Sequence, residues 1–544
     1  MSHTLGRYRR FTSNFQCSYS VYRALTRALH HGQRLSQNAR AGWETVVGLE
    51  IHAQIASHSK LFSGAGTQFA APVNNQVSFL DAALPGTLPV LNRRCAEIGV
   101  MTGLALGCHI NRESRFDRKH YFYADLPQGY QITQQRQPLA EKGEIPYYFF
   151  VANDMKSPTK LSARIHHIQL EQDSGKSLQD PEQNMSLIDL NRAGMALMEI
   201  VTEPDFRSGE EAAAFVKELQ LILTTIGACS GVMAEGAMRV DATVSVNKVG
   251  EPISTGVRVE IKNVNSIRGV AKAIEYEFSR HISLLEKGEK IANETRAFDA
   301  ENVETISMRD KEKVHDYRFM PEPNLPPLRI YDNQTLSSDL SPDQVINVDE
   351  IRSSMAATPE ERRLALQAKY GLSLEHCQVM LTSEGTEDFF TAVMNADTTR
   401  DIAIVYQLLF SILLSFTNEH KIPVDKSPVD IVKFGDTVDL LCSKRITYQV
   451  ARNIFHQYFE AADNRPVEQM VDEEDWWIIT DKTLIEEHCK KLMAESPKKV
   501  KNHKKGYREC GFHKAIVVRT QGRADPVLAR QVVEENMGKF VKKK

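Results

Sequence analysis

The 544-residue sequence predicts an α+β protein, in which a mixed, largely antiparallel sheet is followed by two helical regions. The chain is longer than one hydrophobic core usually supports, so several domains are expected. In the first half, short segments alternate apolar and polar residues with the period of two that is typical of half-buried strands. These segments are VVGLEIHAQI, ARIHHIQLEQD, MALMEIVTEPD, MRVDATVSV and VRVEIKNVNS.

The segment 1–43 differs in composition from the rest of the chain. No acidic residue precedes Glu44, whereas seven arginines do. This composition predicts a mitochondrial transit peptide, and a basic nucleic-acid-binding arm is the alternative. The remainder carries more acidic than basic residues, so an RNA partner would bind through local basic patches.

Residues 44–330 are predicted to form the sheet-rich domain. Two helices interrupt its strands, at Arg94–Leu106 and Ser208–Ile226. The proline-rich segment PEPNLPPL then breaks regular structure. A helical linker domain is expected over 331–398 and a helical tail domain over 399–544. The apolar stretch Ile404–Phe416 is too short for a membrane span and predicts a buried helix, so no membrane partner is expected.

Several familiar catalytic motifs are missing from the sequence. DSGKS contains Gly-Lys-Ser, but Leu170 stands where a phosphate-binding loop requires its first glycine. Neither GxSxG nor HExxH occurs, and the eight cysteines form no CxxC pair. Nothing in the sequence therefore predicts amide hydrolysis or a zinc site.

Carboxylates and one histidine on the predicted strands are the candidate site. Glu50 and His52 lie on the polar face of one strand, opposite the apolar residues. Glu171 follows a second strand, and Glu199 is the single charge in the apolar segment MALMEIV. Carboxylates that keep some water suit Mg²⁺. The alternatives are a solvated strand face for the first pair and a buried ion pair for Glu199.

A basic patch near the C-terminus is the candidate RNA contact. Such a patch neutralises phosphates without reading sequence, and the alternative is a solvated helix face. Its members are Lys498, Lys499, Lys501, Lys504, Lys505 and Arg508.

Longer motifs extend from Val46 to nearly the end of the chain. They include VGLEIHAQIASHSKLFS, LPGTLPVLN, FDRKHYFYADLPQGYQIT, HIQLEQDSGKS, IDLNRAG, EIVTEPDFRS, DYRFMPEPNLPPL and TQGRADP. With these motifs the sequence resembles the B subunits of the glutamyl-tRNA(Gln) amidotransferases. The resemblance implies a cradle domain, a helical linker and a helical tail, and a place in the mitochondrial matrix.

The resemblance also implies a reaction and partners. The cradle would hold Mg²⁺ and ATP and phosphorylate the side chain of glutamate attached to tRNA(Gln). Ammonia from a separate amidase (glutaminase), the A subunit, would displace the phosphate, and a small C subunit would bind the A–B pair. A tRNA-binding scaffold without catalytic activity and a free-standing ligase are the alternatives.

Matching the motifs residue by residue assigns the catalytic and Mg²⁺-binding roles to Glu50, His52, Glu171 and Glu199. Lys119 and Tyr121 are candidates for contacting phosphate or the channel mouth, and an ordinary surface strand is their alternative. Arg192 is expected to pair with phosphate or with an internal carboxylate.

The sequence departs from the family in two places. Gln172 stands where many relatives carry a second glutamate, which removes a negative charge next to Glu171. Some relatives carry cysteine pairs for a structural zinc near NNQVSFLDAALPG, where this chain has none, so no zinc is expected.

Overall fold

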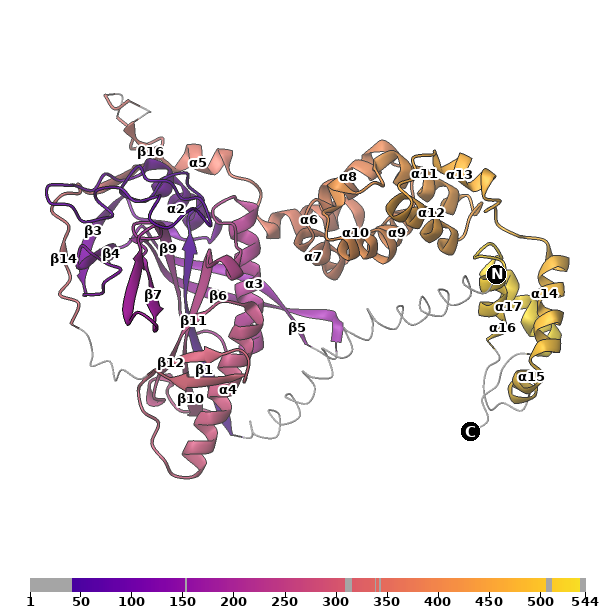
Figure 1. The fold of residues 1–544 in the computed structure, drawn as a ribbon, viewed down its shortest axis with the longest axis horizontal. Helices are drawn as coiled ribbons and strands as arrows, with labels where there is room; N and C mark the ends of the chain where they lie inside the picture. The colour runs from indigo at the N-terminus through magenta and orange to yellow at the C-terminus, as the bar shows by residue number, and fades with distance from the viewer. Residues whose placement is uncertain are drawn as a thin grey trace. The chain divides into compact units, whose positions relative to one another are not determined.

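A computed structural model describes residues 42–151, 154–308, 316–337, 339–341, 344–504 and 511–538. The predicted transit peptide 1–43 thus lies outside the described residues except for its last two. The chain divides into two compact units, Met1–Leu364 and Ala365–Lys544. The first is rich in sheet and the second is helical, which confirms the predicted α+β class (Figure 1). The predicted domain boundaries at 330 and 398 remain predictions.

A nine-stranded sheet forms the centre of the first unit, in the order β13-β12-β11-β10-β1-β9-β6-β5-β2. Every neighbouring pair is antiparallel except β11 and β12, as the alternating sequence patterns predict. Its strands are β1 (Trp43–Gln54), β2 (His109–Ile110), β5 (Ala140–Val151), β6 (Asp154–Gln172), β9 (Ala196–Thr202), β10 (Met238–Lys248), β11 (Val259–Val264), β12 (Thr295–Asp299) and β13 (Glu304–Ser307).

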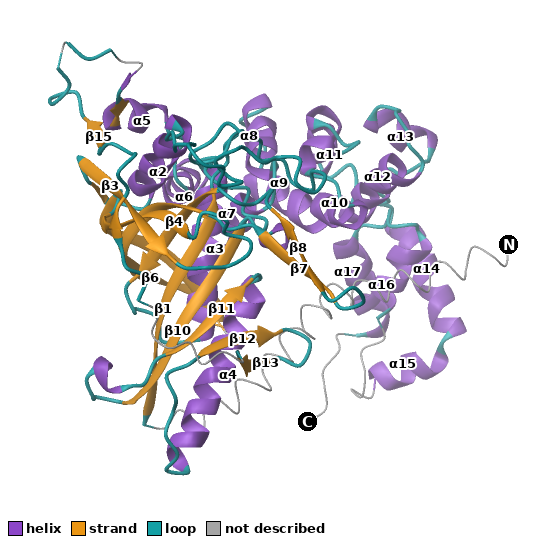
Figure 2. Cartoon of the chain, turned by 60° about the vertical axis from the view of Figure 1, so that its left-hand side comes forward, coloured by secondary structure: helices purple, strands orange, loops and turns teal. Residues whose placement is uncertain are grey.

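Three helices pack on the sheet: α2 (Arg93–Ala105), α3 (Gly209–Thr225) and α4 (Ile267–Glu286) (Figure 2). The first two were predicted, and the Ser208 side chain accepts a hydrogen bond from the backbone N–H of Glu211, as expected of an N-cap. Helix α4 was missed, although Ser266 caps it in the same way. Its apolar positions, such as Ile274, Phe278 and Ile282, follow the helical period, but the polar residues Glu277 and His281 also lie on its buried face.

Smaller elements complete the first unit. β3 (Glu113–His120) pairs with β4 (Tyr130–Gln137), β14 (Met320–Pro321) and β15 (Leu328–Tyr331). The proline-rich segment therefore runs between two short strands that pair with β3. A separate hairpin of β7 (Lys176–Asp180) and β8 (Met185–Asp189) stands apart from the large sheet (Figure 2). β16 (Ile346–Asn347) and α5 (Val348–Ser354) follow, and α6 (Pro359–Tyr370) begins in the first unit and ends in the second.

The second unit consists of helices around two apolar cores. Its helices are α7 (Leu374–Thr382), α8 (Thr386–Ala396), α9 (Ile402–Leu408), α10 (Leu414–His420), α11 (Ile431–Cys442), α12 (Tyr448–Glu460), α13 (Val467–Glu473), α14 (Lys482–Glu495), α15 (Pro497–Lys504), α16 (Phe512–Arg519) and α17 (Pro526–Met537).

The apolar stretch predicted as a buried helix forms α9, one π-helical turn and α10. Among the described residues, Ile402–His420 is the one helix whose length and composition would allow it to cross a membrane, a test that core helices also pass. Val405, Leu408 and Leu413 are fully buried in the larger core of the second unit. The segment therefore contributes a core helix, as predicted.

Candidate catalytic site

The candidate site lies where three central strands of the sheet present polar side chains on one face. Glu50 and His52 alternate along β1 with the buried Leu49 and Ile51. In the antiparallel register, His52 lies opposite Glu199 of β9. Residues directly opposite each other on antiparallel strands share a face. The pairing of the strands therefore brings together residues about 150 positions apart in the sequence.

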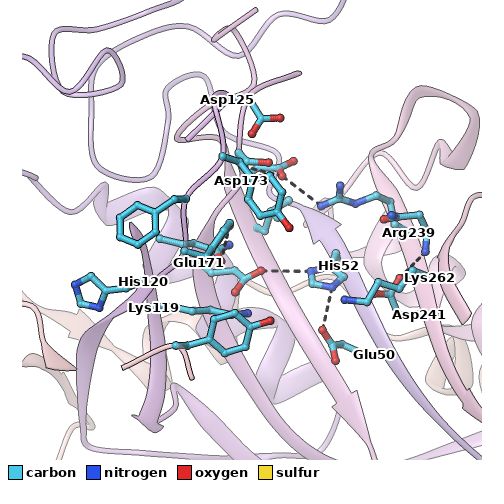
Figure 3. A pocket seen from close by; sticks show the side chains of 18 of the residues that line it. Glu50, His52, Lys119, His120, Asp125, Glu171, Asp173, Arg239, Asp241 and Lys262 are labelled. Atoms are coloured by element: carbon cyan, nitrogen blue, oxygen red, sulfur yellow. Dashed lines mark hydrogen bonds and ion pairs between the residues drawn. The ribbon is translucent and has the colours of Figure 1, made fainter. Parts of the chain in front are cut away.

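His52 is in contact with two carboxylates (Figure 3). Its Nε2 lies 3.1 Å from Glu50 Oε1. Its Nδ1 lies 3.4 Å from Glu171 Oε1, an ion-pair distance without hydrogen-bond geometry. Glu199 Oε2 accepts a hydrogen bond of 3.0 Å from Gln169 Nε2, the neighbouring side chain on β6. All four predicted residues thus lie in one cluster.

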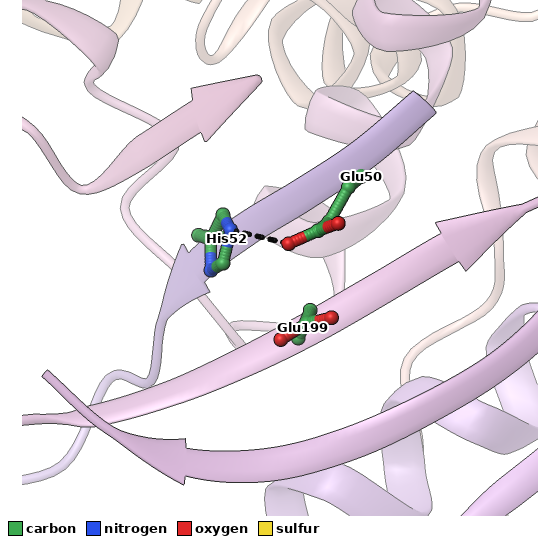
Figure 4. Close-up of side chains that lie close together, drawn as sticks. All are labelled: Glu50, His52 and Glu199. Atoms are coloured by element: carbon green, nitrogen blue, oxygen red, sulfur yellow. Dashed lines mark hydrogen bonds and ion pairs between the residues drawn. The ribbon is translucent and has the colours of Figure 1, made fainter. Parts of the chain in front are cut away.

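Three of the four offer ligand atoms around a common point. One atom each from Glu50, His52 and Glu199 lie within 4.8 Å of one another (Figure 4). Two carboxylates and one imidazole fit a divalent cation that completes its coordination with water or phosphate oxygens. Glu171 lies instead beside the other nitrogen of the imidazole. A carboxylate in that place orients a metal-binding histidine.

The four groups shift one another's proton affinities. Burial raises the pKa of Glu199 well above its ordinary value, and the neighbouring carboxylates Glu171 and Glu50 raise it further. Burial alone would also raise the pKa of Glu171, but His52 and Lys119 lower it to about 2. Burial would lower the pKa of His52, yet its two carboxylate partners hold it well above its ordinary value. The cluster without a metal therefore keeps protons that a bound cation would displace.

A cavity of about 980 Å³ opens over this cluster, within the size range of ligand pockets (Figure 3). Lys119 and Tyr121, the two weaker candidates, both line it. Lys119 Nζ lies 4.9 Å from the centre of the Tyr317 ring. Burial would lower the pKa of Lys119, but Glu171 and Glu199 raise it, so the ammonium group stays charged. The Tyr121 hydroxyl donates to Gln131 Oε1 at 3.2 Å.

Arg192 lies at the edge of this region and holds a turn in place. Its Nε donates to the carbonyl oxygen of Ser174 at 2.9 Å and lies 3.5 Å from Asp173 Oδ2. Of its two predicted partners, the structure therefore supplies the internal carboxylate. Asp173 and Ser174 line the cavity, so Arg192 stabilises part of its wall.

Gln172 does not face the cluster. Its Oε1 accepts a hydrogen bond from the backbone N–H of Ile132 at 3.1 Å. Glu171 and Gln172 are consecutive strand residues, so their side chains point to opposite sides. The missing negative charge at this position is consequently not directed at the proposed metal ligands.

Among the charged residues of the cavity that were not predicted as site residues, three lie on β10 and β11. Arg239 and Asp241 lie on β10, opposite His52 and Glu50 respectively, and Lys262 lies on β11. Burial raises the pKa of Asp241, and this carboxylate accepts a hydrogen bond of 2.7 Å from the backbone N–H of Asn263. The available signal was the alternation of charged with apolar residues in MRVDATVSV, the same signal that identified Glu50 and His52.

The candidate RNA contact belongs to the second unit. Lys498, Lys499, Lys501 and Lys504 lie exposed on α15, whereas Lys505 and Arg508 lie outside the described residues. His503 is buried, and its Nε2 lies 2.9 Å from the carbonyl oxygen of Gly538. Exposed lysines on one short helix agree with either a phosphate contact or a solvated face.

Comparisons with known proteins bear on both units. Residues 45–335 match the family described as the GatB/GatE catalytic domain, and residues 388–537 match the GatB domain. The chain is 47% identical over 512 residues to the mitochondrial glutamyl-tRNA(Gln) amidotransferase B subunit of Homo sapiens, a match that covers 94% of this chain and 91% of that protein.

Two further relatives extend this similarity to insects and bacteria. The protein of the same name from Aedes aegypti is 47% identical over 465 residues, covering 85% of this chain and 87% of that protein. The aspartyl/glutamyl-tRNA(Asn/Gln) amidotransferase B subunit of Rickettsia canadensis is 40% identical over 498 residues, covering 91% of this chain and 98% of that protein.

Proposed function

This chain belongs to the GatB/GatE family, and from that premise we propose that it converts glutamate carried by tRNA(Gln) into glutamine, using ATP and ammonia. It acts as the B subunit in a complex of the mitochondrial matrix. An amidase, the A subunit, supplies ammonia from glutamine, and the small C subunit is the third member of the complex. The exposed lysines of α15 contribute to holding the tRNA.

The reaction proceeds in two balanced steps. A side-chain carboxylate oxygen of the tRNA-bound glutamate attacks the γ-phosphorus of ATP, and the bond to ADP breaks. Ammonia then attacks the carbonyl carbon of the acyl phosphate and expels inorganic phosphate, while a proton leaves the nitrogen. Phosphoryl transfer of this kind depends mainly on positioning and on charge neutralisation.

The residues of the cavity fit these requirements. Glu50, His52 and Glu199 would hold Mg²⁺, which when bound neutralises phosphate charge and aligns the nucleotide. Lys119 and Arg239 contribute positive charge to the cavity, where a triphosphate and the developing charge of the transferred group need it. Glu171 keeps the His52 ring oriented.

The single observation that carries the proposal is the convergence of Glu50, His52 and Glu199 beneath a cavity lined with cationic side chains. A scaffold without catalytic activity has no need to bury carboxylates around one point, because each costs several kcal/mol without a partner. The grouping of these carboxylates next to cationic side chains therefore favours a catalytic subunit over a scaffold without catalytic activity.

The test is the Glu199→Gln variant in the assembled complex. We expect glutaminase activity to persist while ATP-dependent phosphorylation of Glu-tRNA(Gln) falls by at least ~10²-fold, the effect of losing one group that stabilises transition-state charge. Glu203→Gln is the matched control, since Glu203 lies just beyond β9 and does not belong to the group of ligand atoms formed by Glu50, His52 and Glu199. Full transamidation by Glu199→Gln would remove the site from the proposal.

A further inference from the structure

Four aromatic rings form a continuous row beside the cavity, here called the aromatic row. The Tyr121 ring contacts Tyr123 on one side, with centroids 5.7 Å apart, and Tyr317 on the other, with centroids 6.2 Å apart, both edge to face. Tyr317 in turn contacts Phe319, with centroids 6.0 Å apart. The three tyrosines line the cavity. Two segments that are far apart in the sequence therefore build one aromatic surface.

The ends of the aromatic row are open to solvent. Tyr123 is 59% exposed and Phe319 is 36% exposed, whereas Tyr121 and Tyr317 are half-buried. Phe122, which also lines the cavity, is 84% exposed. Exposed aromatic side chains that gather beside a cavity mark a binding surface. Such rings are the platforms on which unpaired nucleobases stack.

Cationic side chains accompany the aromatic row. Lys119 Nζ lies 4.9 Å from the centre of the Tyr317 ring. Arg318, the residue between Tyr317 and Phe319, is exposed and lines the cavity. Among the residues that the structure describes, no carboxylate lies within ion-pair distance of the Arg318 guanidinium group. Aromatic rings interleaved with cations that can reach phosphates are typical of surfaces that bind single-stranded nucleic acid.

Hydrogen bonds hold Arg318 in a backbone conformation that residues with a side chain rarely adopt. Its φ is +46°, in the left-handed region. Its N–H donates to Asp316 Oδ1 at 3.1 Å, and its carbonyl oxygen accepts from His120 Nδ1 at 3.0 Å. The backbone N–H of His120 also donates to the carbonyl oxygen of Tyr317 at 2.9 Å. Strained backbone that its surroundings hold in place is concentrated at functional sites.

A buried ion pair anchors the same segment to β3. Arg118 Nε lies 2.6 Å from Glu322 Oε2, and the Glu322 side chain has no exposed surface. The backbone N–H of Glu322 donates to the carbonyl oxygen of Phe116 at 2.9 Å. Strand β3 therefore carries Lys119 and also holds the segment that contains Arg318. The rings and the cations are ordered before a ligand arrives, which lowers the entropy cost of binding.

We infer that the aromatic row and Arg318 bind the single-stranded 3′ end of the tRNA, an inference that rests on the function proposed above. The glutamyl group is attached to the 3′-terminal nucleotide, so this end must reach the cavity before the carboxylate can meet ATP. A single adenine covers only part of a row of four rings, whereas successive unpaired bases of an RNA strand can use all of it. The bases stack on the exposed rings, and Arg318 pairs with a backbone phosphate.

This contact does not select one tRNA over another. Stacking on an aromatic ring is tolerant of sequence, because every base has a π-face. The aromatic row therefore positions the end that carries the amino acid, and recognition of tRNA(Gln) depends on other surfaces.

The test is equilibrium binding of tRNA(Gln) without an attached amino acid to the assembled complex. Intact tRNA is compared with tRNA that lacks its single-stranded 3′ end. Tyr123→Ala removes an exposed ring, and Arg318→Gln removes the positive charge but keeps a side chain on the same backbone. Each should weaken the binding of intact tRNA at least ~5-fold, the lower limit for losing one base–aromatic stack or one phosphate contact. Neither should change the binding of the truncated tRNA.

Two control variants separate the proposed contacts from general effects. Tyr123→Phe keeps the ring and should restore most of the affinity that Tyr123→Ala loses. Arg329→Gln removes an exposed arginine of β15 that lies 3.6 Å from Glu113, and it should leave both affinities unchanged.

The outcomes distinguish this inference from the proposed function. If Tyr123→Ala and Arg318→Gln bind intact tRNA as the unsubstituted chain does, or weaken intact and truncated tRNA equally, the inference is wrong. It is also wrong if they raise the KM for ATP and leave tRNA binding unchanged, because the rings would then hold the adenine of ATP. Binding of tRNA without an amino acid requires no catalysis. A complex that shows the expected differences in binding yet transfers no phosphate to Glu-tRNA(Gln) supports the inference and contradicts the catalytic role.

Discussion

Glu199 and Glu277 are two buried glutamates of the first unit whose surroundings predict opposite effects of the same substitution. Glu199 has Gln169 as its hydrogen-bond donor and two carboxylates nearby. Glu277 of α4 has no exposed side-chain surface and lies 2.8 Å from Arg280 and 3.1 Å from Arg296. Replacing each with glutamine removes one ionisable group and preserves the shape of the side chain.

The sign of each effect follows from the direction of the pKa shift. Because the pKa of Glu199 is raised, the folded metal-free protein binds this proton more tightly than the unfolded chain does, and stability falls as the pH rises through the folded pKa. The pKa of Glu277 is about 2, compared with 4.5 ordinarily, because the Arg and His groups around it outweigh burial, which acts in the opposite direction. Its contribution is present above pH 4.5 and is lost as the pH falls toward 2.

The shift at Glu277 also sets the size of its effect. For Glu277 the shift of the pKa to about 2 corresponds to about 3 kcal/mol, and removing one member of a buried ionic cluster typically costs ~3–5 kcal/mol. At pH 8 without metal, Glu277→Gln should therefore lower the free energy of unfolding by roughly 3 kcal/mol. Glu199→Gln should raise it, because the substitution removes a carboxylate whose ionised form is disfavoured by burial and by Glu171 and Glu50.

The assay is urea unfolding of the EDTA-treated chain at pH 5 and pH 8, followed by circular dichroism. The gain from Glu199→Gln should shrink at pH 5, where the carboxyl of the unsubstituted protein is closer to neutral. A Glu199→Gln variant that is less stable than the unsubstituted chain at pH 8 without metal would mean that a cationic side chain of the protein already balances this carboxylate. The proposed metal site would then lose its support. The Glu277→Gln result would still test whether the ion pairs of Glu277 with Arg280 and Arg296 stabilise the fold.

Two further variants test the anion-binding parts of the chain. Arg239→Gln removes a positive charge of the cavity that lies 3.3 Å from Asp173. It should raise the KM for ATP about 10- to 100-fold in steady-state assays, because this is the loss expected of one charge-assisted hydrogen bond. Glutaminase activity should be unchanged. Replacing Lys498 and Lys499 of α15 with alanine should weaken tRNA binding and reduce the slope of log binding constant against log salt concentration by ~1–2. The control replaces Lys490 and Lys491 of α14 with alanine and should leave this slope unchanged. Equal slopes for the two double variants would refute the contact of α15 with tRNA.

The sequence predicted the composition of the site better than its geometry. Alternation along one strand was enough to place Glu50 and His52 on a common polar face, because side-chain direction in a strand has a fixed period. It could not show that β9 pairs with β1 so that Glu199 lies opposite His52, since register between distant strands depends on tertiary packing. The resemblance to a family supplied that grouping.

The same limit explains what the sequence analysis missed. Arg239 and Asp241 alternate with apolar residues in β10 as clearly as the predicted pair does in β1. Without the pairing of β10 with β1, a charged face on this strand is indistinguishable from an ordinary solvated one. Helix α4 was overlooked for another reason: its buried face includes the polar residues Glu277 and His281, so that the apolar stripe is incomplete although its period is helical.

The cavity combines two incomplete charge distributions, and this combination restricts what can bind there. The acidic cluster leaves Glu199 buried among other carboxylates, which favours either a proton or a cation at that position. Lys119 and Arg239 line the cavity together with Glu50, His52 and Glu171, and add positive charge there. Both cations already have carboxylate neighbours, since Arg239 lies 3.3 Å from Asp173 and Glu171 and Glu199 raise the pKa of Lys119. A nucleotide without a metal would nevertheless bring its phosphates close to the carboxylates. The proposed metal–triphosphate complex would place its cation among the carboxylates and its phosphates beside Lys119 and Arg239, which is the reason for proposing ATP together with a bound cation rather than either alone.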